Sequence, residues 1–524
     1  MGQRILFCCW AICFLIFVRS GQVLALAYEV WPEETTGSLE YALETAQDGD
    51  TILVHAGRYP GNIVLNKAVS LIGRDNPILD GEGNGDVITV LANDVTIRGF
   101  TIQGSGRNVE KANAGIRLKS VQSVTIQECL FVDNLFGMYL ERASGNTIVD
   151  NEIRGLWSGQ DTSGSGNGPG GSSVSGGGSD SDGGSALDGG PAETRDGHLF
   201  RNEIGDGIHL FSSSENILER NVINQTRDGI YFNYAHTNQT IGNEISEVRY
   251  GIHFMNSDDN VFRENTLYDN KAGAALMFSK RIRLENNVFA FSRGFRAYGI
   301  LFATCDYSVA EGNIFMNNTI GIFCDISRHN VFRGNLFYRN DVGLDLISSS
   351  ADNLFFENNF IDNLQPVAMP AGRVGDDNLF YKDGVGNYWD DYRGFDLDRD
   401  GIGDIPHKTG DPFTFLMAKS PGVRLFLSSP AATALEFSER MFPVVHIPKV
   451  VDPYPLTEPV KMDALASVHS TMSQSGLDRH QGTFALIGCS ILMLVAAGSL
   501  ILWASSPRFR RTTVLKRGRK DKNG

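Results

Sequence analysis

The sequence predicts an all-β fold, a right-handed, single-stranded parallel β-helix, followed by a C-terminal transmembrane helix. Two short fragments recur through the middle of the chain with a dominant step of about 22 residues, in the range typical of repeat architectures. Each fragment is too short for a helix and alternates apolar and polar residues as a strand does. A long apolar run near the C-terminus has the length that a membrane-spanning helix needs.

The two recurrent fragments define the coils of the predicted solenoid. One fragment is Gly-Ile-x-Leu/Phe or a close variant, and the other is Asn-x-Ile/Phe/Leu. The first begins at Gly115, Gly137, Gly207, Gly229, Gly251, Gly273, Gly299, Gly321 and Gly343. The second begins at Asn151, Asn202, Asn221, Asn243, Asn265, Asn287, Asn313 and Asn335. From Gly207 onward the glycines recur at one constant step, except for a single longer step between Gly273 and Gly299.

Stacking of coils allows such fragments to bury their apolar side chains and to pair their backbone hydrogen-bonding groups. No single coil can bury its apolar face, whereas coils stacked at ~4.8 Å pair their backbones and close a continuous core. We expect the recurrent Asn to form amide ladders at the corners and Gly to permit left-handed turns there. The LxxLxL pattern of leucine-rich repeats and the periodicity of helical repeats are missing, which leaves a pectin-lyase-like solenoid.

The N-terminus is predicted to be a signal peptide, residues 1–27. Arg4 precedes an apolar run from Ile5 to Val18, and Ala25-Leu26-Ala27 offers a small-x-small cleavage site. The mature chain would then begin near Tyr28, and an uncleaved anchor is the alternative.

Residues 28–363 are expected to form the β-helix with an N-terminal cap. Ser38–Ala46 has the pattern of an amphipathic helix that covers the first coil, as terminal repeats require. Asp50–Gly104 is expected to form irregular early coils. Residues 158–192 are a Gly/Ser/Asp tract with almost no apolar content, which predicts a disordered insert within one coil.

Residues 364–480 leave the repeat and are expected to close the domain, ending in an extended strap. The prolines of the strap are Pro443, Pro448, Pro453, Pro455 and Pro459. Residues 483–503 form the predicted transmembrane helix. Residues 504–524 carry eight Lys or Arg residues, which marks this tail as cytoplasmic. The β-helix is therefore expected outside the cell membrane, in the periplasm or at the cell exterior.

Charge and cysteine content narrow the function classes. Without the predicted signal peptide and tail, 36 basic and 60 acidic residues remain, a net charge near −24. Such a surface repels nucleic acid and suits cations or basic partners. Cys129, Cys305 and Cys324 are the cysteines of this outer part and lack CxxC spacing, which predicts buried structural thiols.

Two columns of outward side chains follow from aligning the glycines. With the glycine of each fragment counted as the first residue, the third residues are Arg117, Tyr139, His209, Tyr231, His253, Ala275, Leu301, Phe323 and Asp345. The fifth residues are Lys119, Glu141, Phe211, Asn233, Met255, Met277, Ala303, Asp325 and Ile347.

The columns contain a candidate copper site. Met255 and Met277 should lie ~5 Å apart on adjacent coils, with His253 on the same face. Thioether and imidazole ligands favour Cu(I), although the two Met residues also fit an ordinary apolar role. His209 lies two coils from His253, ~10 Å away, with Tyr231 between them, so by itself it fits a surface residue better than a ligand.

A candidate calcium loop lies in the closing segment. Asp396, Asp398, Asp400 and Asp404 have the odd spacing of an EF-hand loop, and Gly401 stands at its sixth place. His407 replaces the Glu of the twelfth place. Both a structural Ca²⁺ loop and a plain acidic turn fit this pattern.

The β-helix also serves enzymes that act on polysaccharides, which require paired carboxylates. Asp325 and Asp345 form one such pair, expected ~8 Å apart on adjacent coils, a separation typical of inverting glycosidases. The pair is isolated, and the sequence contains no evident Ser/His/Asp arrangement or phosphate loop. We expect no catalysis, with a polysaccharide-active enzyme and a metal-free surface repeat as alternatives.

Several fragments carry a family resemblance. They are RDGIYF at 227–232, RYGIHFM at 249–255, AGAALMFS at 272–279, GNYWDDYRGFDLDRDGIGDIP at 386–406, SPAATALEFSERMFPVV at 429–445 and VDPYPL at 451–456. From about residue 37 to 460 the chain resembles the NosD family, exported β-helix proteins needed to mature nitrous oxide reductase.

The resemblance implies an accessory role without catalysis. It implies an ABC transporter partner, with a cytoplasmic ATPase and a membrane permease, that helps to assemble the copper–sulfide centre of the reductase. It also implies a copper chaperone lipoprotein that delivers Cu(I), and it makes the His253, Met255 and Met277 face a candidate Cu(I) relay. The chain departs from the usual pattern in its own membrane span and in the insert at 158–192.

Overall fold

The computed structural model describes residues 26–32, 38–156, 204–347, 349–369, 378–409 and 450–462, with four single positions between 429 and 438. The predicted insert 158–192, span 483–503 and tail 504–524 lie outside these residues, as does the signal peptide up to residue 25. Within the described ranges, no helix is long and apolar enough to cross a membrane.

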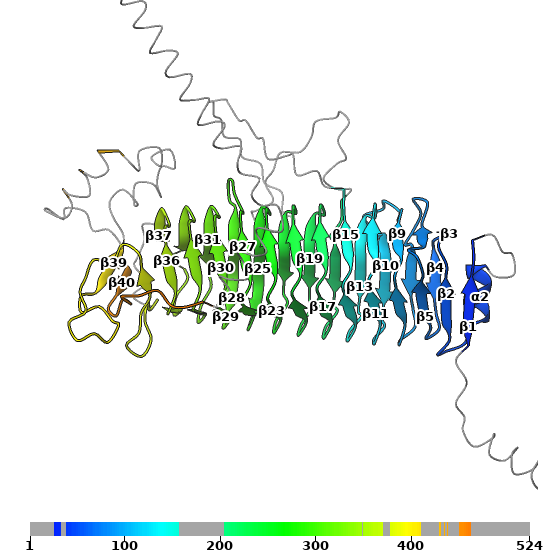
Figure 1. Ribbon diagram of the computed structural model, residues 1–524, viewed down its shortest axis with the longest axis horizontal. Coiled ribbons are helices and arrows are strands. Elements are labelled where there is room, and N and C mark those ends of the chain that lie inside the picture. The colour runs from blue at the N-terminus through cyan, green and yellow to red at the C-terminus, as the bar shows by residue number, and fades with distance from the viewer. Residues whose placement is uncertain are drawn as a thin grey trace, which may run out of the picture. The chain divides into compact units, whose positions relative to one another are not determined.

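The described chain is an all-β, right-handed parallel solenoid of about 13 turns, built from three parallel sheets (Figure 1). Sheet A contains β1 (Ala27–Val30), β2 (Thr51–Val54), β5 (Ser70–Gly73), β8 (Thr96–Arg98), β11 (Thr125–Gln127), β14 (Thr147–Val149), β17 (Ile217–Glu219), β20 (Gln239–Ile241), β23 (Val261–Arg263), β26 (Arg283–Glu285), β29 (Val309–Glu311), β32 (Val331–Arg333) and β35 (Leu354–Phe356).

Sheets B and C complete each coil. Sheet B contains β3 (Arg58–Pro60), β6 (Ile78–Asp80), β9 (Thr101–Gln103), β12 (Leu130–Val132), β15 (Glu152–Arg154), β18 (Val222–Asn224), β21 (Glu244–Ser246), β24 (Thr266–Tyr268), β27 (Val288–Ala290), β30 (Ile314–Met316), β33 (Leu336–Tyr338), β36 (Asn359–Ile361) and β38 (Tyr388–Trp389). Sheet C contains β4 (Ile63–Leu65), β7 (Ile88–Val90), β10 (Ala114–Lys119), β13 (Phe136–Glu141), β16 (Ile208–Phe211), β19 (Asp228–Asn233), β22 (Tyr250–Met255), β25 (Ala272–Lys280), β28 (Tyr298–Asp306), β31 (Ile320–Asp325), β34 (Val342–Leu346) and β37 (Gln365–Ala368).

The core is a set of stacked columns along the solenoid axis. One column runs Phe289, Phe315, Phe337, Phe360 and Trp389, with ring centroids 5.2, 5.1, 4.7 and 4.4 Å apart. Trp389 belongs to β38, so the solenoid continues past the boundary expected at residue 363. The closing segment supplies the last ring of a column that begins in the repeats.

Buried asparagines form the expected ladders. Asn243 is typical: its Nδ2 donates to Asn265 Oδ1 at 3.0 Å and to Leu218 O at 2.9 Å. Its Oδ1 accepts from the backbone N and the Nδ2 of Asn221, at 2.9 and 3.0 Å. Each amide therefore ties its coil to both neighbours and satisfies backbone groups that the corner leaves unpaired.

The recurrent glycines have a different role from the expected one. Gly229, Gly251 and Gly273 do not have positive φ, whereas the left-handed corners hold residues such as Gln225, Thr237 and Glu247. A Cβ on Gly251 would lie 2.5 Å from Gly273 O and 2.5 Å from Leu267 Cδ2. The glycines recur because each coil packs directly onto the backbone of the next.

The two ends of the solenoid are covered. At the N-terminal end, helix α2 (Leu39–Thr45) begins at Ser38, whose Oγ accepts a hydrogen bond from Tyr41 N. At the other end β39 (His407–Thr409) pairs with β40 (Val450–Asp452) in an antiparallel arrangement. Buried Asp452 there accepts hydrogen bonds from Trp389 Nε1 at 2.9 Å and from Asn387 N at 2.7 Å. Burial raises the pKa of Asp452 above its ordinary value.

Candidate functional site

The outward columns of sheet C have the register expected from the glycine alignment. Arg117, Tyr139, His209, Tyr231 and His253 are successive partners across five strands. The column then becomes apolar, with Ala275, Leu301 and Phe323, before it reaches Asp345. One face of the solenoid is thus divided into an aromatic and charged half and an apolar half.

The aromatic and charged half is a continuous column of side chains in contact, of which Tyr139 and His209 are stacked and the later ring pairs are edge-on or tilted. The guanidinium of Arg117 lies 4.8 Å from the centroid of the Tyr139 ring. Beyond it, the centroids are 4.6 Å apart from Tyr139 to His209, 4.7 Å from His209 to Tyr231 and 4.6 Å from Tyr231 to His253. Burial raises the pKa of Tyr231 to about 12, so its hydroxyl keeps its proton at neutral pH.

Two fully buried carboxylates hold the two imidazoles. Asp206 lies 2.8 Å from His209 Nδ1, and Asp228 lies 2.9 Å from His253 Nδ1. Arg227 binds Asp206 through two nitrogens, at 3.0 and 3.1 Å. Arg249 binds Asp228 in the same way, at 2.9 and 2.8 Å.

The carboxylates are ionised despite their burial. Burial by itself would raise the pKa of both Asp206 and Asp228. The charge of Arg227 and the hydrogen bond from His209 lower the pKa of Asp206 below its ordinary value. The hydrogen bonds from Arg249 and His253 lower the pKa of Asp228 in the same way.

An ionised carboxylate fixes the tautomer of the imidazole beside it. Because it can only accept a hydrogen bond, the neutral ring must carry its proton on Nδ1, which leaves the lone pair of Nε2 for another partner. Histidines that bind metal ions are commonly oriented in this way. His209, which the sequence suggested as a surface residue, is instead 8% exposed and held as firmly as His253.

The two methionines are register partners, as the alignment predicted. Met255 of β22 pairs with Met277 of β25. Met255 is half-buried, whereas Met277 is only 5% exposed. His253 stands two residues before Met255, roughly 7 Å along the strand on the same face. His253 and Met255 are therefore partly exposed on the same strand, and the nearly buried Met277 lies beside Met255 on the next strand.

The sequence-based site omitted Asp206, Asp228, Arg227 and Arg249. Each Asp stands directly before the glycine of its coil, and each Arg stands two places before the glycine of the next coil. The partnerships cross coils, over 21 residues for each Asp–Arg pair. The sequence signal that could have indicated these ion pairs is the Arg that stands two places before Gly229 and again two places before Gly251.

Three carboxylates of the candidate calcium loop lie close together. Ligand atoms from Asp396, Asp398 and Asp400 lie within 4.8 Å of one another. Asp404 is outside this group, and its Oδ2 accepts a hydrogen bond from Leu397 N at 2.7 Å. Gly401 has φ +89°, as the sharp turn requires.

The remaining candidate residues, Asp325, Asp345 and His407, lie outside the group formed by His253, Met255 and Met277. Asp325 accepts a hydrogen bond from Ser349 Oγ at 3.0 Å, while Asp345 is the register partner of Phe323, not of Asp325. His407 is buried against Trp389, with ring centroids 4.7 Å apart, and burial lowers its pKa. His407 therefore belongs to the closing segment, apart from the sheet C face.

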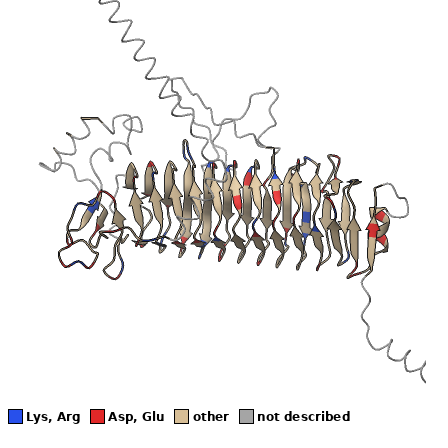
Figure 2. Ribbon diagram, in the orientation of Figure 1, with Lys and Arg blue, Asp and Glu red and all other residues tan. Residues whose placement is uncertain are grey.

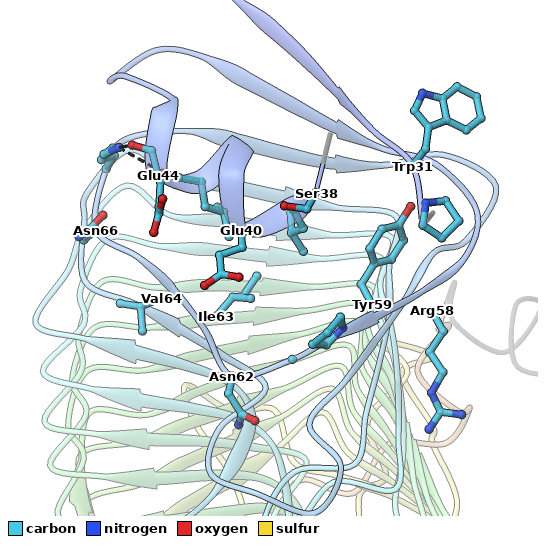
Figure 3. Close-up of a pocket in the computed structure, with 16 residues that line it drawn as sticks. Trp31, Ser38, Glu40, Glu44, Arg58, Tyr59, Asn62, Ile63, Val64 and Asn66 are labelled. Atoms are coloured by element: carbon cyan, nitrogen blue, oxygen red, sulfur yellow. Dashed lines mark hydrogen bonds between the residues drawn. The ribbon is translucent and has the colours of Figure 1, made fainter. Parts of the chain in front are cut away.

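A pocket of about 810 Å³ lies beside the N-terminal helix, and Ile63 and Val64 of β4, the first strand of sheet C, contribute to its lining. Figure 3 shows Glu40 of α2 directed over Ile63, with Trp31 and Tyr59 on the other wall. Acidic residues on α2 are visible in Figure 2. The Arg58 side chain at this pocket is paired with Asp80 at 2.6 Å.

The fold and the outward residues of sheet C define the class of protein. It is a parallel β-helix with an oriented imidazole, that of His253, near two paired methionines. The family model described as periplasmic copper-binding protein (NosD) matches residues 52–167 and 191–394, more than half of the chain. The chain belongs to this NosD family.

Curated relatives agree with the family. The chain is 29% identical over 416 residues to a probable ABC transporter binding protein NosD of Pseudomonas aeruginosa, covering 76% of this chain and 86% of the relative. A protein of the same description from Stutzerimonas stutzeri is 28% identical over 417 residues, covering 76% and 85%. A cell surface glycoprotein of Methanothermus fervidus is 26% identical over 388 residues, covering 72% and 55%.

The solved structures that resemble this chain include two polysaccharide-active enzymes. The catalytic domain of a GH87 α-1,3-glucanase has a TM-score of 0.48 at 13% identity, covering 70% of this chain and 69% of its own. An alginate lyase from Paenibacillus has a TM-score of 0.40 at 14% identity, covering 55% and 94%. At these values the likeness carries no statement about activity.

Proposed function

We propose that this exported protein is an accessory factor for the maturation of nitrous oxide reductase and that it passes Cu(I) along the outer face of sheet C. The observation that carries the proposal is the pairing of Met255 with Met277 beside His253, whose Nδ1 is occupied by Asp228. Membership of a family described as copper-binding supports it.

The ligand set suits a transient relay. Thioether and imidazole donors bind Cu(I) in preference to hard cations. Because Met277 is nearly buried, the ion would first meet His253 and Met255. His209 offers a second imidazole two coils away, ~10 Å along the axis, too far to share one ion with His253. Copper is cargo in this proposal, and no catalysis by the chain is required.

The partners of this function are an ABC transporter with permease and ATPase subunits, a copper chaperone lipoprotein and the reductase itself. The names of two relatives as ABC transporter binding proteins support the first of these. The segment 483–503 would hold the protein in the cell membrane, with the β-helix outside and the tail 504–524 in the cytoplasm.

The test is an anaerobic Cu(I) titration of the full-length protein against a competing chelator. The test variant carries His253→Ala, Met255→Ala and Met277→Ala. The control is Met316→Ala, which removes an outward-facing thioether of β30 on sheet B. We expect stoichiometric binding by the wild type and the control and at least a tenfold weaker affinity in the triple variant. Equal affinity in all three proteins would move the site away from this face.

A further inference from the structure

One coil of the solenoid is longer than its neighbours, and hydrogen bonds locate the extra residues. Ser292 takes the place of the ladder asparagine, since its N donates to Asn318 Oδ1 at 2.9 Å, as Val248 N donates to Asn270 Oδ1 at 3.0 Å. Tyr298 is in register with Ala272 and Ile320. With Ala297 directly before Tyr298, the insertion is Arg293-Gly294-Phe295-Arg296, and it accounts for the single longer step of the repeat.

The base of this insertion is fixed to the following coils. Arg293 Nη1 donates to Asn318 O and to Asp341 Oδ1, both at 2.9 Å. Gly294 N donates to Thr319 Oγ1 at 3.1 Å. The insertion rises above the neighbouring turns in Figure 1, between β27 and β28. It is therefore a projecting turn with an anchored base.

The tip of the insertion is apolar and basic. Phe295 is 87% exposed, more than any other large apolar side chain of the described residues. The Arg296 guanidinium lies 5.4 Å from the centroid of the Phe295 ring. Within the described part of the chain, no carboxylate forms an ion pair with Arg296. An exposed Phe with an unneutralised Arg on an acidic domain is complementary to an apolar pocket with an acidic rim.

The insertion lies at the edge of the candidate copper face. It leads directly into β28, the strand that pairs with the Met277 strand β25. The outward residues next to it form an apolar cluster of Ala272, Ala275, Tyr298 and Leu301, packed by Tyr250. Tyr250 in turn contacts His253, with ring centroids 5.0 Å apart. A partner seated on this finger would lie over the sheet C face.

We propose that Arg293–Arg296 is a docking finger for the apo reductase that receives copper at this face, an inference that rests on the function proposed above. The partner presents an apolar pocket that encloses Phe295, with carboxylates at its rim for Arg296. A membrane surface suits the finger less well, because one phenylalanine gives only roughly ten- to a hundredfold of affinity for a bilayer. A protein pocket encloses the ring completely and adds directed ion pairs.

The test measures binding of the full-length protein to apo nitrous oxide reductase from the same organism and to vesicles of phosphatidylethanolamine and phosphatidylglycerol. One variant is Phe295→Ser with Arg296→Glu, and a second deletes residues 293–296, which restores the common step of the repeat and so keeps the coil regular. The control is Tyr307→Ser, which removes an exposed aromatic side chain at the other end of β28.

We expect both finger variants to bind the reductase at least tenfold more weakly than the wild type and the control, with unchanged Cu(I) affinity. Equal binding by all four proteins would overturn the docking role and leave the proposed function standing. Loss of vesicle binding in the finger variants, with reductase binding intact, would overturn it in favour of a membrane contact. A wild type that binds Cu(I) but not the reductase would contradict both proposals.

Discussion

At the scale of single residues, Asp228 connects stability to the proposed chemistry. It is fully buried, pairs with Arg249 through two hydrogen bonds and orients the His253 ring. Buried charges of this kind contribute little net stability as a pair, but removing one partner leaves the other uncompensated. The residue therefore fixes the geometry of the face, and its loss should be costly.

We expect Asp228→Asn to lower the free energy of unfolding by roughly 3 kcal/mol, because it removes a fully buried negative charge that both Arg249 and His253 bind. Asp259→Asn is the matched control, since Asp259 also binds an arginine through two nitrogens, Arg281 at 2.6 and 2.7 Å, but at the surface. That change should cost about 0–1 kcal/mol. Urea unfolding measures both, and equal losses would contradict the role assigned to burial.

The depressed pKa of Asp228 predicts a pH dependence. A carboxyl whose pKa is lower in the folded state contributes stability above its unfolded pKa, and this contribution disappears as pH falls through the folded value. The difference in unfolding free energy between wild type and Asp228→Asn should therefore be constant from about pH 7 to 5 and shrink below the ordinary value of 3.8. A difference that stays constant down to about pH 3 would argue that Asp228 is not ionised in the fold.

At the scale of elements, the strands and the asparagine ladder could be predicted from the sequence. The residues that adopt left-handed conformations at the corners, and the role of the glycines, could not. The constant step of the repeat determined the register of His253, Met255 and Met277, because one slip would turn every side chain to the other face. The same step did not show that the glycines serve close packing. Left-handed corners occupied by Gln225 or Glu247 have no local sequence signal, since stacking of the coils holds them there.

The ladder itself can be tested at Asn243. Asn243→Ala removes the acceptor of two Asn221 hydrogen bonds and the donor to Leu218 O, all in the buried interior. We expect a loss of roughly 3 kcal/mol in urea unfolding, since each stranded buried group costs about 1–3 kcal/mol. Asn224→Ala, on β18 and half-buried, should cost less than about 0.5 kcal/mol. Similar losses would show that the ladder is not a principal source of stability.

The acidic loop of the closing segment is a separate element. If Asp396, Asp398 and Asp400 bind Ca²⁺ with an affinity of about 10⁻⁴ M, then about 1 mM Ca²⁺ should stabilise the protein by roughly 1.4 kcal/mol and raise its Tm. Mg²⁺ at the same concentration is the control ion, because its smaller octahedral site needs different ligands. Asp398→Asn with Asp400→Asn should abolish the shift. No shift with either ion would leave a plain acidic turn.

At the scale of the whole molecule, the solenoid behaves as a one-dimensional array of near-identical units. Deletion of residues 313–334 removes one complete coil and joins Gly312 to Asn335, so each ladder and sheet keeps its register. We expect the shortened protein to fold and to unfold with an m-value lower by roughly one thirteenth, in proportion to the surface lost. Deletion of 313–323 removes only half of that coil, so the strands beyond it lose their partners in all three sheets, and it should prevent folding beyond that point, as measured by protease resistance and circular dichroism.

Because the coils are stacked at a constant spacing, the length of the solenoid changes by equal increments when coils are added or removed. Each added or removed coil moves everything beyond it by ~4.8 Å along the axis and changes nothing in the turns that remain. The spacing between the imidazoles, the thioethers and the projecting Phe295 is thus set by whole-number differences in coil position. Insertion or deletion of whole coils would therefore change these spacings in steps of ~4.8 Å without any change to the remaining coils.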